Sequence, residues 1–154
     1  FAIQQQGGFE PVVLMMADYG YDTYSTTIET SQKLVDENPD LVQRFVNATI
    51  EGWYNYLYGD NKKANELIKT DNPEMTDEQI AFSIEALKKY GIVDSGDART
   101  MGIGAMTDAR WESFFTKSVV WGVYPAELTY KTGYTTKFVN QGHGLDLRKQ
   151  LTGE

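Results

Sequence analysis

Residues 38–59 read NPDLVQRFVNATIEGWYNYLYG, a pattern that predicts one long helix. Asn38 can cap its start, Pro39 suits its first position, and Gly59 is typical of a C-terminal stop. Apolar or small side chains recur at three- and four-residue spacing and predict a single apolar stripe: Val42, Phe45, Val46, Thr49, Trp53, Tyr56 and Leu57. We therefore expect an amphipathic helix that packs by this stripe.

Four further segments have helical patterns. They cover residues 31–37, 61–69, 76–91 and 107–122. The third opens with Thr76-Asp77-Glu78-Gln79, which resembles a capping box, and the fourth opens with Thr107 and Asp108. The residues from Gly142 onward show no periodicity, so we expect this tail to fray.

Two segments outside these helices have strand-like composition. Pro11–Ala17 reads PVVLMMA, a continuous apolar run typical of a strand buried on both faces of a parallel sheet. Residues 24–30 are rich in Thr, Tyr and Ile and form a second candidate. Two strands do not make a stable sheet, so the expected fold is α/β, helix-rich, with few strands of an incomplete mixed or parallel sheet. The chain is then expected to be part of a larger unit.

The composition of the chain excludes several kinds of functional site. The chain has 154 residues, which corresponds to about one domain, and a net charge of −8, which disfavours nucleic-acid binding. It has no cysteine, which excludes disulfides, thiolate metal sites and a cysteine nucleophile, and one histidine, which excludes multi-histidine metal sites. No catalytic residue, metal site or cofactor is predicted. Ten tyrosines and three tryptophans favour binding of a flat ligand instead.

The residues between the two predicted strands carry the candidate chemistry. Tyrosines, carboxylates and hydroxyls gather in residues 18–27, directly after the first predicted strand, where ligands bind in open α/β sheets. The candidate ligand-binding residues are Asp18, Tyr19, Tyr21, Asp22, Tyr24 and Ser25. The tyrosine rings can stack on a planar solute, and a carboxylate can accept hydrogen bonds from its amino groups. The alternative is an exposed turn in which Asp and Gly only reverse the chain.

Several motifs of this sequence together resemble those of a known protein family. It rests on motifs in a fixed order: Ala17–Gly20, Thr26–Ile28, Glu37–Val42 with Phe45 and Gly52-Trp53, and Gly102–Thr107 followed by Asp108 and Arg110-Trp111. In order and spacing they resemble the C-terminal half of the substrate-binding proteins that serve ABC importers of thiamine pyrimidine precursors. The wider set includes binding proteins for nitrate, sulfonates and riboflavin-like ligands.

The resemblance implies a partial fold of the type II periplasmic-binding-protein kind, in which two α/β lobes close on a ligand. Residues 1–30 would supply crossover strands and hinge, 31–141 the helical part of a lobe, and 142–154 a tail. The implied function is the solute-binding component of an ABC importer that binds a small aminopyrimidine-like ligand in an interlobe cleft. Implied partners are a membrane permease and an N-terminal half. The implied location is periplasmic or extracellular, with a lipid anchor as an open alternative.

Two alternatives remain at this stage. A related fungal hydroxymethylpyrimidine synthase has a cysteine-rich run where this sequence has Gly20–Tyr24 without cysteine, so the resemblance favours a binding protein over an enzyme. A helical interaction module without a small ligand is the third interpretation. A single half is expected to show weak or no ligand affinity. Its exposed sheet edge and lobe interface are expected to favour dimerisation or strand exchange.

Overall fold

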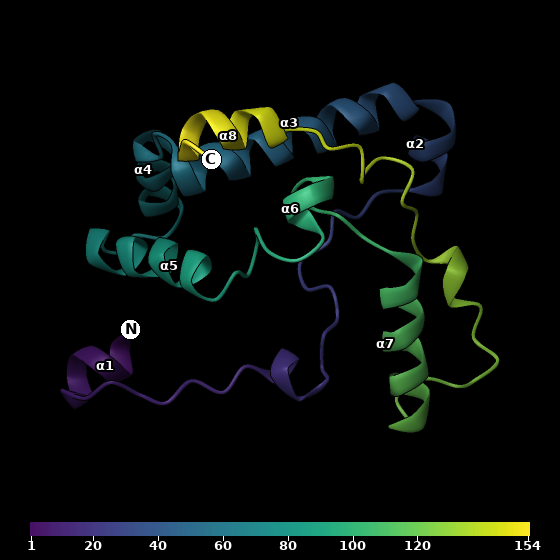
Figure 1. The fold of residues 1–154 in the computed structure, drawn as a ribbon, viewed down its shortest axis with the longest axis horizontal. Coiled ribbons are helices and arrows are strands. Elements are labelled where there is room, and N and C mark those ends of the chain that lie inside the picture. Colours follow the sequence, from purple (N-terminus) through teal and green to yellow (C-terminus); the bar gives the residue numbers. More distant parts are fainter.

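The computed structural model describes residues 1–154. All of its regular elements are helices, joined by irregular segments (Figure 1). The α-helices are α1 (Ala2–Gly7), α2 (Gln32–Glu37), α3 (Pro39–Tyr58), α4 (Lys62–Asp71), α5 (Asp77–Lys89), α6 (Ala98–Met101), α7 (Asp108–Val120) and α8 (Leu145–Thr152). Two 3-10 helices, η1 (Met16–Tyr19) and η2 (Tyr130–Thr132), complete the elements. No residue is in a strand, so the expected α/β fold with an incomplete sheet is wrong.

Neither of the two predicted strands forms in this structure. Residues 11–15 and 24–30 follow irregular paths without a ladder partner, and Met16 already belongs to η1. A strand is stable only when a neighbour pairs with its backbone groups, and no other part of this chain offers one. The apolar run is consequently left in solvent, with Val12 87% and Leu14 71% exposed.

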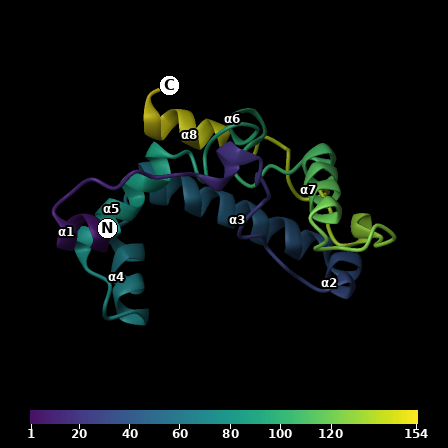
Figure 2. The same ribbon diagram turned by 90° about the horizontal axis from the view of Figure 1, so that it is seen from below.

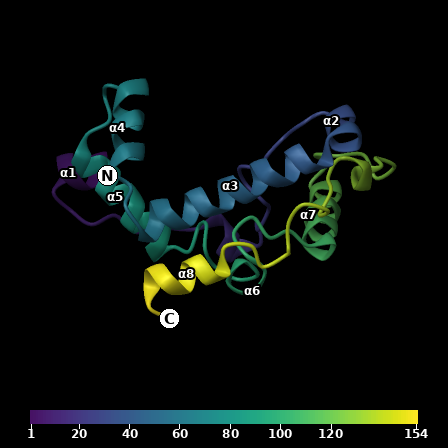
Figure 3. The same cartoon turned by 90° about the horizontal axis from the view of Figure 1, so that it is seen from above.

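Helix α3 is the spine of the molecule, and one of its faces forms the main core. The buried side chains of this face are Val42, Val46, Ile50, Tyr54 and Leu57. They pack with Ile103, which follows α6, and with Phe138, which precedes α8. Figures 2 and 3 show α8 and α6 on one side of α3, with α4 projecting from its C-terminal end.

The buried face of α3 differs from the predicted stripe. Val42, Val46 and Leu57 are buried as expected, and Ile50 and Tyr54 complete the buried face. Thr49, Trp53 and Tyr56 are half-buried, and Trp53 packs against the same core. Phe45 is 60% exposed. The predicted stripe therefore lies at the edge of the buried face, and only its member Phe45 is mostly exposed to solvent. Periodicity identified the helix but did not fix the centre of its buried face.

The predicted helix starts are confirmed, but the capping bond expected of Asn38 is absent. The side-chain oxygens of Ser31, Thr76 and Thr107 accept hydrogen bonds from the backbone N–H groups of Leu34, Gln79 and Arg110. These bonds satisfy donors that have no partner within the helix. Asn38 occupies the N-cap position of α3 but makes no side-chain capping bond there.

The expectation of a frayed tail is wrong, because residues 145–152 form α8. Leu147 and Leu151 pack against the α3 core. The guanidinium of Arg148 donates to Asp94 at 2.9 Å, and both residues are buried. These contacts join segments far apart in sequence, so local periodicity did not reveal them. None of the helices is both long and apolar enough to cross a lipid bilayer.

Candidate functional site

The predicted ligand-binding segment, residues 18–25, lies against α7. Helix η1 ends at Tyr19 and is followed by its C-cap Gly20, whose φ of 92° lies in the left-handed region that favours glycine. The N–H of Tyr21 donates to the carbonyl of Met16 and closes the turn. The chain then leaves in a direction that brings Tyr21, Asp22 and Tyr24 onto α7.

Two cations of α7 hold this segment by its backbone. The ammonium of Lys117 donates to the carbonyl of Gly20 at 2.8 Å and to a carboxylate oxygen of Asp22 at 2.7 Å. The Nε of Arg110 donates to the carbonyl of Asp22 at 2.6 Å. Arg110 also donates to the carbonyl of Thr23 at 3.4 Å. Because both side chains come from one helix, they fix the backbone carbonyls of Gly20, Asp22 and Thr23.

The ion pair also sets the electrostatics of Asp22. The hydrogen bond from Lys117 lowers the pKa of the Asp22 carboxyl below its usual value, and the nearby charges of Lys117 and Arg110 act in the same direction. Partial burial opposes this effect without reversing it. Asp22 is therefore an anion whose charge is already neutralised by α7, which makes it a poor candidate for contacting a ligand directly.

The two tyrosines that flank Asp22 pack on aromatic side chains. The ring of Tyr21 stacks on Trp121 at 5.9 Å between centroids and meets the edge of Phe114. The ring of Tyr24 lies under the guanidinium of Arg110, at 4.4 Å, and next to Trp111.

The phenol oxygen of Tyr24 is also engaged. It accepts a hydrogen bond of 2.8 Å from the N–H of Thr107, at the start of α7. Tyr24 therefore anchors the segment, whereas Tyr21 is 41% exposed and leaves part of its ring free.

The remaining three predicted residues do not join this contact. Asp18, Tyr19 and Ser25 are exposed, and their side chains make no hydrogen bond within the chain. Tyr19 is 77% exposed. The six residues thus divide into an anchored group, Asp22 and Tyr24, and a solvent-facing group, with Tyr21 between them.

Sequence reasoning missed the residues that organise this site. It predicted a helix over residues 107–122, but it gave no site role to Arg110, Lys117 or Trp121. A signal was present: Arg110 and Lys117 are seven residues apart, which places two cations on one helix face. Paired with the acidic segment at Asp18 and Asp22, that spacing could have indicated the docking.

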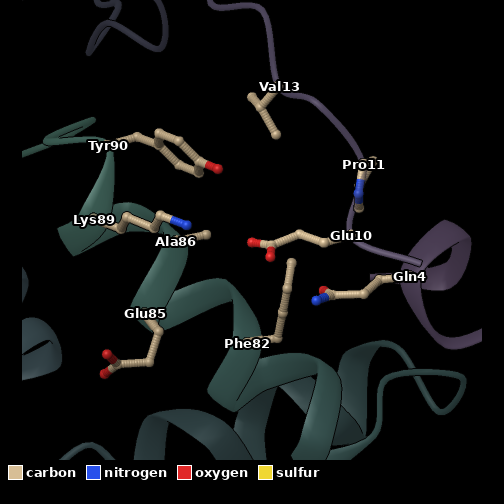
Figure 4. Close-up of a pocket in the computed structure, with 9 residues that line it drawn as sticks. All are labelled: Gln4, Glu10, Pro11, Val13, Phe82, Glu85, Ala86, Lys89 and Tyr90. Carbon is tan, nitrogen blue, oxygen red and sulfur yellow. The ribbon is translucent and has the colours of Figure 1, made fainter. Parts of the chain in front are cut away.

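A separate hollow lies between the N-terminal segment and α5 (Figure 4). Its volume is about 200 Å³, and its walls include Gln4 and Glu10 on one side and Phe82 and Lys89 on the other. None of the six predicted residues lines it. No group of three or more His, Cys, Asp or Glu side chains is placed to hold a metal ion.

Comparison with known proteins gives one match. No curated protein and no solved structure matches the chain. Residues 2–64, which contain all six predicted residues, match the family described as NMT1/THI5 like. This match supports the family resemblance over that part of the chain.

Proposed function

We propose that this chain is part of the solute-binding component of an ABC importer and that residues 18–25 contact a small planar ligand such as an aminopyrimidine. Substrate-binding proteins make up most of the family that residues 2–64 match. The match is compatible with a solute-binding role. The ligand class rests on the side chains of the segment itself.

One observation carries the proposal: α7 holds part of the segment 18–25 in place, while other side chains of the segment remain open to solvent. Arg110 and Lys117 fix the backbone around Asp22, so the neighbouring rings are positioned before a ligand arrives. Preorganisation of this kind reduces the entropy that binding must overcome. The free groups are the Tyr19 ring, the outer face of Tyr21 and the Asp18 carboxylate.

These free groups suit a flat, hydrogen-bonding solute. A phenol ring stacks on a planar heterocycle, and the Asp18 carboxylate can accept hydrogen bonds from its amino group. An anion such as a sulfonate or nitrate would need free cations, whereas the nearest cations, Arg110 and Lys117, are already paired with this segment.

The wider mechanism requires a second lobe. The site is open on its outer side, and in this proposal an N-terminal lobe covers it when ligand binds. A ligand that contacts both lobes favours the closed state by its differential contacts. Closure then forms the surface that a membrane permease recognises, in the periplasm or outside the cell.

Isothermal titration calorimetry of the natural full-length protein with a hydroxymethyl-aminopyrimidine tests the proposal. Tyr21→Ala should raise the Kd by about tenfold or more, because stacking on one aromatic ring contributes roughly 1–3 kcal/mol. Asp18→Asn should weaken binding less than Tyr21→Ala does. The matched controls are Tyr90→Ala and Asp71→Asn, both exposed and outside the segment, which should bind like the unmodified protein. Undetectable binding by the unmodified protein, or an unchanged Kd for Tyr21→Ala, would contradict the proposal.

A further inference from the structure

One face of α7 carries the side chains that hold the segment 18–25. Its members recur at four- and three-residue spacing: Arg110, Phe114, Lys117 and Trp121. Arg110 and Lys117 donate to backbone carbonyls of the segment, and the rings of Phe114 and Trp121 pack on Tyr21. Trp121 is the only one of the four that is exposed, at 50%. The last residue of this face therefore contacts the segment and still presents much of its ring to solvent.

The backbone of Trp121 is fixed although its side chain is exposed. Trp121 is the C-cap of α7, and Gly122 follows it with a φ of 72°. The N–H of Gly122 donates to the carbonyl of Val119 at 3.0 Å, and the N–H of Val123 donates to the carbonyl of Ser118 at 2.8 Å. These two bonds form the Schellman motif, which ends a helix with a glycine in the left-handed region. The indole thus projects from a defined helix end and not from a frayed one.

Tyr21 and Trp121 form a stepped pair of rings. Their planes are 25° apart, and their centroids are separated by 5.9 Å. Carbon atoms of stacked rings make contact at only roughly 3.5–4.0 Å, so the two rings are displaced sideways. Part of each ring consequently stays uncovered, which agrees with the exposure of both side chains. The open part of the indole is a flat apolar ledge next to Tyr21, and we call it the Trp121 ledge.

The end of α7 that carries the Trp121 ledge is apolar and uncovered. Val120, Val123 and Tyr124, the neighbours of Trp121 in the sequence, are all exposed. This end of α7 lies away from α3, so the main core does not cover it (Figure 1). Exposed apolar side chains that gather at one place are typical of a contact surface.

We propose that Trp121 contacts the ligand directly, with a flat ring of the ligand stacked on the Trp121 ledge beside Tyr21. This inference rests on the proposed function and adds to the site a wall that no residue of the segment 18–25 supplies. The indole is larger than the phenol ring of Tyr21 and offers more area for stacking. Its position at a fixed helix end also means that little freedom is lost when the ligand binds.

The Trp121 ledge also narrows the class of ligand. An indole has one N–H donor and no acceptor, so it suits a ring that carries an acceptor nitrogen. Lys117, four residues before Trp121 on the same face, is already paired with Asp22 and is not free to neutralise an anion. We therefore expect a heteroaromatic ring without negative charge, such as an aminopyrimidine, in preference to a sulfonate, a phosphate or an aliphatic solute.

Isothermal titration calorimetry of the natural full-length protein with a hydroxymethyl-aminopyrimidine gives the first test. Trp121→Ala should raise the Kd by about tenfold or more, because a stacking face is lost. Trp121→Phe keeps an aromatic ring and should stay within about threefold of the unmodified protein. Trp121→Leu keeps an apolar side chain against Tyr21 but has no flat ring, so it should bind as weakly as Trp121→Ala. Val120→Ala is the matched control, because it removes an exposed apolar side chain at the same helix end and should leave the Kd unchanged.

Nuclear Overhauser effects separate direct contact from an effect that Trp121 exerts through Tyr21. The indole resonances of Trp121 are assigned by their loss in Trp121→Phe. In the complex of the unmodified protein, these protons should show Overhauser effects to protons of the bound ligand. A residue that only supports Tyr21 from behind would show none.

The outcomes distinguish this inference from the proposed function. If the unmodified protein does not bind the pyrimidine, the proposed function is wrong and this inference falls with it. If Tyr21→Ala weakens binding but Trp121→Ala does not, this inference alone is wrong. Equal Kd values for Trp121→Phe and Trp121→Leu, or no Overhauser effect between Trp121 and the bound ligand, would likewise overturn it while the proposed function stands.

Discussion

Replacing Asp94 by asparagine should destabilise the fold more than any surface substitution. Asp94 is 5% exposed and accepts hydrogen bonds from Arg148 at 2.9 Å and from the Tyr58 hydroxyl at 2.7 Å. Through these bonds it joins α8 to the C-terminal end of α3. Asparagine keeps the shape of the side chain but removes the charge, which leaves the buried guanidinium of Arg148 without its main partner.

The expected loss follows from this geometry. Removing one member of a buried ion pair costs about 3–5 kcal/mol, mostly because the other charge is left uncompensated. Arg148 keeps a second carboxylate, Glu154, at 2.8 Å, but that side chain is 66% exposed and screened by water. We therefore expect a loss near the lower end, about 3 kcal/mol, which for a chain of this length lowers the Tm by about 9 °C.

Urea denaturation followed by circular dichroism measures this loss directly. Asp146→Asn is the matched control, because its side chain is 94% exposed and it should change the unfolding free energy by less than about 0.5 kcal/mol. The double variant Asp94→Asn with Arg148→Met should recover part of the loss, because it removes the uncompensated charge. A loss below about 1 kcal/mol for Asp94→Asn would refute the reasoning.

Three further outcomes are expected. In urea denaturation, Gly144→Ala should lower the free energy of unfolding more than Gly104→Ala does. Both positions have a positive φ, but only at Gly144 would a Cβ meet an aromatic ring, that of Tyr54 at 2.6 Å. Equal losses would count against this close packing. Burial and a neighbouring carboxylate raise the pKa of Tyr58 to about 12, so the native state keeps a proton that the unfolded state releases near pH 10. Stability should consequently fall by about 2 kcal/mol between pH 10 and pH 12, and Tyr58→Phe should flatten this part of the profile. Lys117→Met should let the pKa of Asp22 return upward toward its usual value in a carbon-detected NMR titration, and no movement would show that the ion pair does not form in solution.

For the candidate site, composition alone predicts the segment but not which of its side chains are free to contact a ligand. Tyrosines and carboxylates gather in residues 18–25, and this property of the sequence does not depend on the fold. Which of these groups are free was decided by α7: it occupies Asp22 and Tyr24 and leaves Asp18 and Tyr19 in solvent. A local sequence pattern could not predict which side chains are free, because their contacts on α7 and at its start lie more than eighty residues away in the sequence.

The helices were determined by the sequence, since capping oxygens, an N-terminal proline and apolar spacing act within a few residues. Thr76, Thr107 and Pro39 therefore begin helices as expected. The absence of a sheet was decided only by the tertiary structure, because a strand exists through a neighbour and Pro11–Ala17 has none. Helix α8 was likewise decided by distant contacts, because the Arg148–Asp94 pair and the α3 core stabilise a segment whose own pattern predicts no helix.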